Sequence, residues 1–273
     1  MSHLHFPDGL LPLWLIVAGF ALTALILSLS LKRLKAEENF VRKVSLLAIL
    51  SALMLVAMSI PLGFIHYHVN LAVLVSLLLG PWLSFIGVFV VNFFLGFIGH
   101  GGLTVVGLNT LVVGSEVFLA HCIFYGLRHF LKTVPAVLCT TVLTLFLSSL
   151  LMVSLVATAG LSPSLLGDSH HHEHGHNHDD GHHQEDHQDH GHDDGHHQED
   201  HQTLASSPQT RNGSGFLSYL EAFFKYILPF LLAGALIEAA VTGGIVKYLR
   251  KVKPDLVEHL YREKEPQEKV EVS

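Results

Sequence analysis

Long runs of apolar residues, separated by short polar segments, follow one another along most of the chain. A transmembrane helix needs about 20 predominantly apolar residues. Five runs come close to that length or exceed it: residues 10–31, 44–60, 103–127, 134–160 and about 227–249. The pattern therefore predicts an all-α fold, a polytopic transmembrane helical bundle.

A further apolar segment, residues 70–98, has a different length. Its 29 residues are too many for one upright span and rather few for two. Gly80-Pro81 interrupts it, and proline removes a backbone donor and breaks helices. We expect two short, tilted or broken helices there, which brings the total to about seven spans.

The composition agrees with this class of protein. Hydrophobic residues make up 50% of the chain and charged residues 14%, and the mean hydropathy is +0.45. The two cysteines, Cys122 and Cys139, both lie in predicted spans. We expect them to be buried packing residues and not a disulfide.

Clusters of basic residues predict the orientation of the chain. Lysine and arginine are enriched in cytoplasmic loops, and here they gather within residues 32–43, 128–132 and 247–253. Seven spans then place the N-terminus and a long loop outside and the C-terminus inside, with residues 216–226 as a short interfacial helix.

The predicted parts are an N-terminal metal-binding segment (1–9), the transmembrane bundle (10–160), a His-rich disordered extracytoplasmic loop (161–215), the interfacial and last transmembrane helices (216–253) and a cytoplasmic tail (254–273).

Residues 168–202 consist almost only of His, Asp, Glu, Gln and Gly, and one ten-residue string occurs twice, beginning at Asp179 and at Asp193. Without apolar residues to form a core, we expect this tract to be disordered. Imidazoles mixed with carboxylates form many weak sites for Ni²⁺, Co²⁺ and Zn²⁺. We interpret the loop as accessory metal capture without selectivity; the alternative is a solvated spacer. Its histidines are His170, His171, His172, His174, His176, His178, His182, His183, His187, His190, His192, His196, His197 and His201.

The amino terminus is a candidate for a selective metal site. A free α-amine at Met1 and the backbone nitrogen at Ser2 are two nitrogen donors next to the first span. With the imidazole of His3 or His5 they make an all-nitrogen set, which suits Ni²⁺ or Cu²⁺ in square-planar or tetragonal geometry. The alternative is two ordinary surface histidines.

Further candidates lie in two predicted loops on the outer face. His66 and His68 are two residues apart, so both could bind one metal ion only from an extended segment, and we expect one of them to be the ligand. His100 stands among glycines at a span boundary, where a structural hydrogen bond is the alternative to ligation. His121 and His129, on the cytoplasmic half, are assigned to packing or an interface.

Two acids and several absences bear on mechanism. Glu116 and Glu238 lie inside predicted spans, which is costly unless they are paired or face a polar cavity. We expect interhelical hydrogen bonding of a protonated carboxyl group, with proton coupling as the alternative. The sequence has no P-loop ATPase motif, no span with His or Asp pairs at i, i+4 spacing, and no catalytic constellation that would indicate an enzyme.

Several short motifs together resemble one family. Residues 5–9, His-Phe-Pro-Asp-Gly, are similar to the N-terminal His-Ile-Pro-Asp-Gly of the CbiM/NikM family, the metal-capturing membrane components of energy-coupling-factor cobalt and nickel transporters. His68, twelve residues before Gly80-Pro81-Trp82, matches that family's loop histidine before its Leu-Gly-Pro-Trp. Other similar segments are residues 101–104 with Asn109, and residues 248–250 with 254–256. The resemblance covers nearly the whole chain outside the histidine loop.

The resemblance implies a ligand set for one Co²⁺ or Ni²⁺ ion: the terminal amine, the second residue's backbone nitrogen and imidazole, and the loop histidine, here His68. Alignment on Pro-Asp-Gly puts the family's imidazole at His5, with three extra residues before it, whereas removal of Met1 would make His3 the second residue. Both histidines therefore stay open. His100 replaces an acidic residue of the family, and we treat His100 and Asn109 as supporting or structural positions.

The function that the resemblance implies is metal capture for ATP-driven uptake across a prokaryotic inner membrane, supplying cobalamin or nickel-enzyme synthesis. Separate chains would bring the ATP chemistry: a transmembrane coupling protein and ABC-type ATPase subunits, with a small accessory membrane protein as a further partner. Membrane lipid would surround the bundle, and no nucleic acid is expected. The alternatives are a secondary carrier or exporter with a histidine buffer loop, and a membrane metal sensor. The choice between cobalt and nickel stays open, because both accept imidazole and amine nitrogen.

Overall fold

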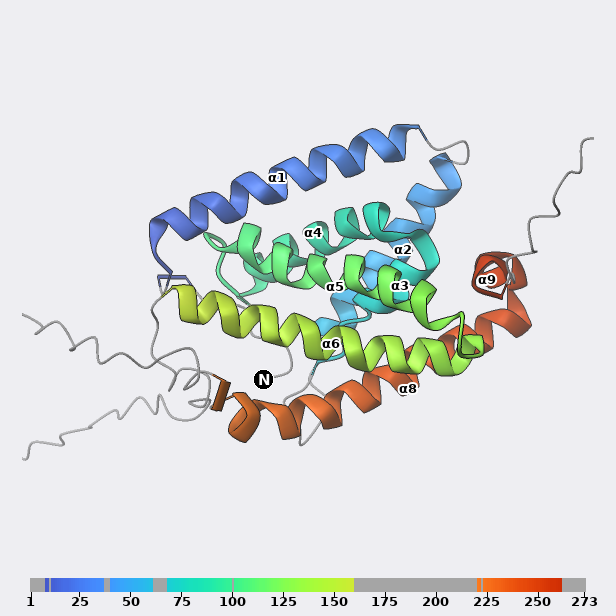
Figure 1. Ribbon diagram of the computed structural model, residues 1–273. Helices are drawn as coiled ribbons and strands as arrows, with labels where there is room; N and C mark the ends of the chain where they lie inside the picture. The colour runs from blue at the N-terminus through green and yellow to red at the C-terminus, as the bar shows by residue number, and fades with distance from the viewer. Residues whose placement is uncertain are drawn as a thin grey trace, which may run out of the picture.

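The computed structural model describes residues 8–9, 11–36, 40–60, 68–99, 101–159, 220–221 and 223–261, and the regular elements in these ranges are all helical (Figure 1). In chain order they are α1 (Leu13–Lys35), α2 (Phe40–Ser59), α3 (Ala72–Leu79), α4 (Pro81–Ile98), α5 (Val106–Leu127), α6 (Thr133–Thr158), the π-helical turn η2 (Phe223–Ile227), α8 (Leu228–Val252) and α9 (Pro254–Tyr261). The predicted all-α bundle is confirmed.

Six helices in the described ranges, α1, α2, α4, α5, α6 and α8, are long and apolar enough to cross a membrane. Their outward faces carry large apolar side chains such as Trp14, Phe97 and Leu236, which are 59%, 64% and 64% exposed. A lipid-facing surface explains this exposure, because water would not favour it. The protein is a multi-pass membrane protein.

The break predicted in residues 70–98 is present, between α3 and α4. It lies at Gly80, whose φ of 80° and ψ of 163° are a conformation that essentially only glycine adopts. Pro81 then begins α4. Of the two helices expected to be short, α3 has 8 residues but α4 has 18 and is a full candidate span, so the expectation is wrong for α4.

α3 crosses only about half of the bundle. At about 1.5 Å per residue its length is about 12 Å, against about 30 Å for the hydrocarbon core of a bilayer. Its amino end follows Asn70, which contacts the middle of α5, and its Leu77 carbonyl accepts a hydrogen bond from α9. Because α2 and α4 both begin at the cavity that α3 borders, the chain must cross between residues 60 and 81. The six candidate spans and this broken crossing agree with the predicted total of about seven.

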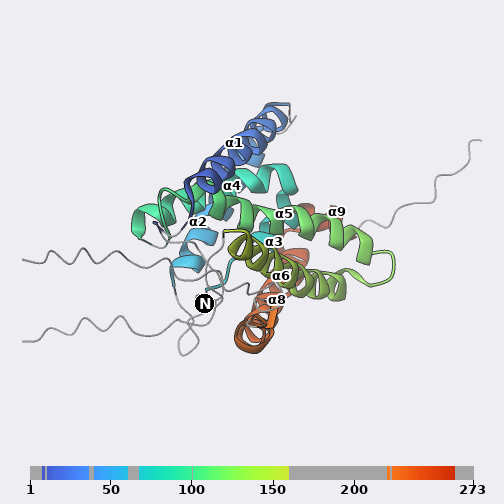
Figure 2. The ribbon, with the colours of Figure 1, turned by 60° about the vertical axis from the view of Figure 1, so that its left-hand side comes forward.

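Small residues bring the helices close together. A Cβ added at Gly107 of α5 would lie 2.9 Å from the Cα of Phe20 on α1, and Thr23 on α1 donates a 2.7 Å hydrogen bond to the Gly107 carbonyl. A Cβ at Gly243 of α8 would lie 2.8 Å from Leu138 of α6. Gly243, which lies on the same helix as Glu238, therefore allows α6 and α8 to pack closely. Figures 1 and 2 show α6 and α8 side by side.

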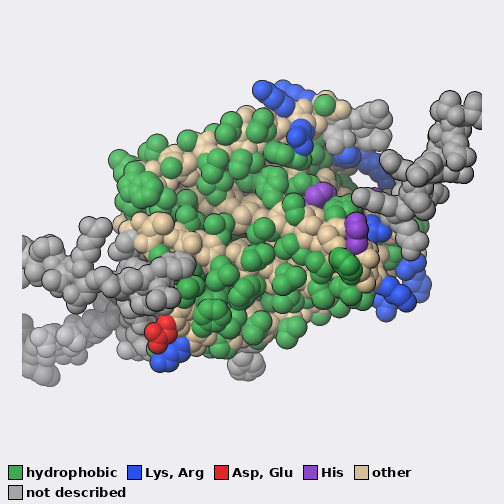
Figure 3. All heavy atoms as spheres, in the orientation of Figure 1, with side chains coloured by type: hydrophobic (Ala, Val, Ile, Leu, Met, Phe, Trp, Pro, Cys, Tyr) green, Lys and Arg blue, Asp and Glu red, His purple; other side chains and the backbone are tan. Residues whose placement is uncertain are grey.

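Basic residues gather at one end of the bundle, where α9 also lies (Figures 1 and 3). We call it the basic end. It holds Lys32, Arg33, Lys35, Arg42, Lys43, Arg128, Lys132, Lys247, Arg250, Lys251 and Lys253. The opposite end holds Asp8, the turn between α4 and α5, and η2.

The structure modifies three further predictions. Cys122 and Cys139 are free thiols and are exposed on the bundle surface, so the expectation that they are buried is wrong. The predicted interfacial helix falls partly outside the described residues, and its described part consists of the helical residues 220–221 and the turn η2, which continues directly into α8. The predicted tail begins with α9, whose Val257 and Leu260 are fully buried.

Candidate functional site

The carboxylate of Asp8 joins the segment before α1 to the turn before α5. It accepts hydrogen bonds from the backbone N–H of Leu103 at 3.1 Å and of Thr104 at 2.9 Å, and from the Thr104 hydroxyl. Two motifs that are 95 residues apart in the sequence, Pro-Asp-Gly and Gly-Gly-Leu-Thr, thus form one contact. We call this contact the Asp8 anchor.

The absence of a side chain at Gly102 and the lowered pKa of Asp8 both favour the anchor. A Cβ at Gly102 would lie 2.6 Å from the Cγ of Asp8, so only glycine leaves room for the carboxylate. The hydrogen bond from the Thr104 side chain, followed by the backbone hydrogen bonds, lowers the pKa of Asp8 below its ordinary value, although partial desolvation opposes the shift. Asp8 is therefore ionised at neutral pH.

Asp8 is also the first residue that the structure describes. Met1, Ser2, His3 and His5 lie outside the described residues. The anchor therefore fixes the described start of the chain beside the turn before α5.

His68 begins the described segment that leads into α3. The residue is half-buried, and its Nδ1 atom is shielded from solvent. Residues 68–71 are not helical, and Leu71 has a φ of 60°, which is uncommon for a residue other than glycine. Non-helical backbone at membrane depth is tolerated only inside a protein, and unusual backbone of this kind is typical of functional sites.

Two residues after His68, Asn70 bridges two buried acids. Its Nδ2 donates to Glu116 Oε2 at 2.5 Å, and its backbone N–H donates to Glu238 Oε2 at 3.3 Å. Ser148 on α6 donates to the other Glu116 oxygen at 2.9 Å. The expected hydrogen bond between helices is therefore present at Glu116, whereas Glu238 accepts its 3.3 Å hydrogen bond from the non-helical Asn70. We call Asn70, Glu116 and Glu238 the inner cluster.

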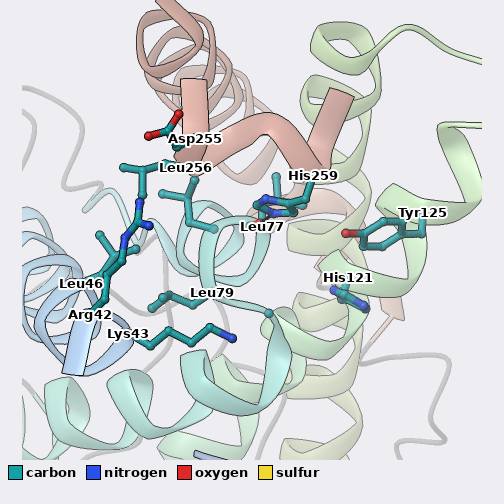
Figure 4. Close-up of a pocket in the computed structure, with 12 residues that line it drawn as sticks. Arg42, Lys43, Leu46, Leu77, Leu79, His121, Tyr125, Asp255, Leu256 and His259 are labelled. Carbon is teal, nitrogen blue, oxygen red and sulfur yellow. Dashed lines mark hydrogen bonds between the residues drawn. The ribbon is translucent and has the colours of Figure 1, made fainter. Parts of the chain in front are cut away.

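A cavity of about 350 Å³ opens at the basic end, between the starts of α2 and α9 and the ends of α3 and α5 (Figure 4). His121, Tyr125 and His259 line one side, and Arg42 with Lys43 the other. The Nε2 of His259 lies 2.8 Å from the Leu77 carbonyl. His121, assigned to packing or an interface from the sequence, packs its ring against Tyr125 with 4.6 Å between the centroids and also lines the cavity.

Most of the metal ligands proposed from the sequence lie outside the described residues. These are Met1, Ser2, His3, His5, His66, His100 and the histidines of the loop. His68 and Asn109 are described, and Asn109 is buried in the first turn of α5. The described ranges contain no group of three or more His, Cys, Asp or Glu side chains placed to hold a metal ion.

Sequence reasoning missed the anchoring role of Asp8 and the bridging role of Asn70. Asp8 was noted only as part of a motif, and its partner loop is remote in the sequence. Asn70 stands two residues after His68, which is a usable signal, but no sequence pattern indicates that it meets Glu116 and Glu238.

Comparison with known proteins now decides the family. The profile described as "Cobalt uptake substrate-specific transmembrane region", CbiM, matches residues 5–256. The chain belongs to the CbiM family. Its role as a metal-uptake membrane component follows, and both the family and the similar structures are transporters and not enzymes.

Two solved structures have the same fold as this CbiM family member. The crystal structure of a transition metal transporter aligns with a TM-score of 0.63 at 20% identity, covering 96% of this chain and 100% of that chain. The crystal structure of a truncated transition metal transporter aligns with a TM-score of 0.62 at 19% identity, covering 91% and 99%. Among curated proteins, no sequence matches the chain significantly.

Proposed function

We propose that this CbiM family member captures one Co²⁺ or Ni²⁺ ion and delivers it for ATP-driven uptake of the energy-coupling-factor type. The observation that carries the proposal is the position of His68. This residue is half-buried at the point where a non-helical segment enters the bundle. The family to which the chain belongs is described as a cobalt uptake region. Imidazole nitrogen is a suitable ligand for both ions.

The ligands that we propose are His68, the terminal amine, the next backbone nitrogen and the imidazole of His3 or His5, with His66 as the alternative to His68. The Asp8 anchor supports this set, because it holds the described start of the chain beside the turn before α5. We call this set the outer site. The histidines of residues 170–201 would raise the local metal concentration without selecting among ions.

The basic end would face the cytoplasm, since lysine and arginine are enriched there in membrane proteins. The N-terminus and the histidine loop would then lie outside and the C-terminus inside a prokaryotic inner membrane. A transmembrane coupling protein and ABC-type ATPases would act as separate chains, with a small accessory membrane protein as a further partner. The metal would serve cobalamin or nickel-enzyme synthesis.

Competitive binding of Ni²⁺, Co²⁺ and Zn²⁺ tests the outer site. The protein lacking residues 168–202 should bind one tight equivalent, and His68→Ala in that background should abolish it. His129→Ala, which changes an exposed histidine at the basic end, is the matched control and should keep the equivalent. If all tight binding disappears with the loop, the outer site is wrong and a metal sensor or exporter becomes the better interpretation.

Partner dependence tests the transport mode. Metal uptake by cells should require the coupling protein and the ATPase together with this chain. Uptake by this chain alone, driven by an ion gradient, would instead indicate a secondary carrier.

A further inference from the structure

The middle of the bundle contains an unusual concentration of hydrogen-bond acceptors. Glu116, Glu238 and Asn70 are 1%, 0% and 0% exposed. Ionisable groups inside a membrane are costly, and they mark ion pathways more often than they serve packing alone. Because one asparagine contacts both carboxyl groups, these groups share a single site.

One acceptor in this cluster lacks a donor. Asn70 Oδ1 is buried and has no hydrogen-bond partner in the described part of the chain. An amide oxygen can only accept, and it belongs to the same planar amide as the Nδ2 that contacts Glu116, so it lies beside that carboxyl group. Buried acceptors are normally satisfied, and a cation would satisfy this one together with the carboxylates.

Backbone groups around the cluster direct partial positive charge toward the two carboxyl groups. α3 begins two residues after Asn70, so the positive end of its helix dipole faces the cluster, and the Asn70 N–H donates to Glu238. His68 of the proposed outer site is two residues away on the other side. The inner cluster is thus connected directly to the segment on which we place metal capture.

Polar groups continue from the cluster toward the basic end. Thr144 lies one turn from Ser148 on α6, and Thr242 lies one turn from Glu238 on α8, on the same helix faces. Both threonines are fully buried, and neither hydroxyl has a hydrogen-bond partner in the described ranges. Beyond them, at the basic end, is the cavity lined by His121 and His259 (Figure 4).

We propose that Asn70, Glu116 and Glu238 form a second cation site, which binds the transported divalent ion after it leaves the outer site. The inference rests on the proposed function. Two carboxylates balance the charge of one divalent ion, and the amide oxygen adds a third ligand. Oxygen ligands hold Co²⁺ and Ni²⁺ less tightly than nitrogen ligands do, and conduction needs a site that also releases its ion.

Crystals of the full chain grown with Co²⁺, with diffraction measured at the cobalt edge, test this directly. We expect one anomalous peak at His68 and a weaker one between Glu116 and Glu238. In Glu116→Gln, which keeps the shape of the side chain, the inner peak should vanish and the outer peak should remain. The outer peak also shows that the variant is folded.

Uptake by cells that express the partner subunits gives the functional test. Glu116→Gln and Glu238→Gln should each lower uptake by about tenfold or more while capture of the first ion is unchanged. Glu221→Gln, which changes an exposed acid before α8, is the control and should behave as wild type.

Two outcomes would overturn the second site: an anomalous cobalt peak at His68 alone in wild type, or normal uptake in both variants. No peak at either position refutes the proposed function, and the inference with it.

Discussion

Asp8 shows how one carboxylate connects two distant parts of the sequence. It satisfies two backbone N–H groups that precede α5 and so fixes the segment in front of α1. The proposed nitrogen ligands belong to the seven residues before it, which lie outside the described part of the chain. We therefore treat Asp8 as a positioning residue for the outer site.

Removing the anchor should weaken metal capture. In Asp8→Asn one acceptor oxygen is replaced by a donor, and in Gly102→Ala the new Cβ displaces the carboxylate. Each should lower Co²⁺ affinity by about 10–100-fold, the usual effect of losing a group that orients a ligand. Titration of the purified proteins measures this. Gly126→Ala, which adds a Cβ with no atom within 4 Å, is the control, and wild-type affinity in both variants would contradict the anchoring role.

The anchor should not respond to pH in the physiological range. The pKa of Asp8 is lowered below its ordinary value of 3.8, mainly by the Thr104 side chain. The contribution of the anchor to Co²⁺ affinity is therefore complete above pH 3.8. It is lost only as the pH falls through the lowered pKa of Asp8. Between pH 7.5 and 5 the affinity should fall through imidazole protonation near pH 6.5. Co²⁺ titrations at a series of pH values should show that affinity falls with the same midpoint pH in wild type and in Asp8→Asn. A different midpoint pH in the variant would contradict this assignment.

At the scale of elements, α3 is the distinctive feature. It is half the length of a span, it begins after a strained residue at Leu71, and it ends at a glycine in a glycine-only conformation. Broken helices at mid-membrane are typical of transporter binding sites, because the break exposes backbone groups to the ligand. Here the non-helical residues before α3 place Asn70 between two acids of α5 and α8.

Gly80 should be sensitive to any side chain. Although a Cβ there meets no atom within 4 Å, the φ of 80° strains every other residue. Gly80→Ala should cost about 1–3 kcal/mol of stability, seen as a lower unfolding temperature in detergent. Gly244→Ala, also without a neighbour within 4 Å but without a positive φ, should change the unfolding temperature little. Equal effects of the two substitutions would show that the α3–α4 break is not strained.

At the scale of the whole molecule, the basic residues are distributed unevenly along the bundle. Most lysines and arginines lie at the basic end, whereas the Asp8 anchor lies at the opposite end. α6 ends and η2 begins at the opposite end, and the histidine tract lies between them in the sequence. This separation is what a protein needs if it collects cations on one side and contacts partners on the other.

Deletion of residues 168–202 should affect uptake only when metal is scarce. A capture segment raises the local ion concentration but adds no selective site, so the half-saturating metal concentration should rise several-fold while the maximal rate stays unchanged. Uptake rates over a range of Co²⁺ concentrations measure both. A deletion that abolishes uptake at every concentration would place the loop in the transport step itself, and replacement by an equally long Gly-Ser segment controls for loop length.

The sequence by itself determined the helical membrane bundle, the break at Gly80-Pro81 and the clustering of basic charge, because these depend on local composition and on the length of apolar runs. The resemblance to the CbiM family can also be recognised from the sequence, since it rests on short motifs. Only the tertiary structure decided that Asp8 meets Thr104 and that Asn70 meets Glu116 and Glu238, because these contacts join residues 46 to 168 positions apart. It also decided that α3 stops halfway, that α9 packs on the core and that both cysteines are exposed on the bundle surface. Hydropathy gives the number of crossings, but the face that each helix presents depends on how its neighbours pack.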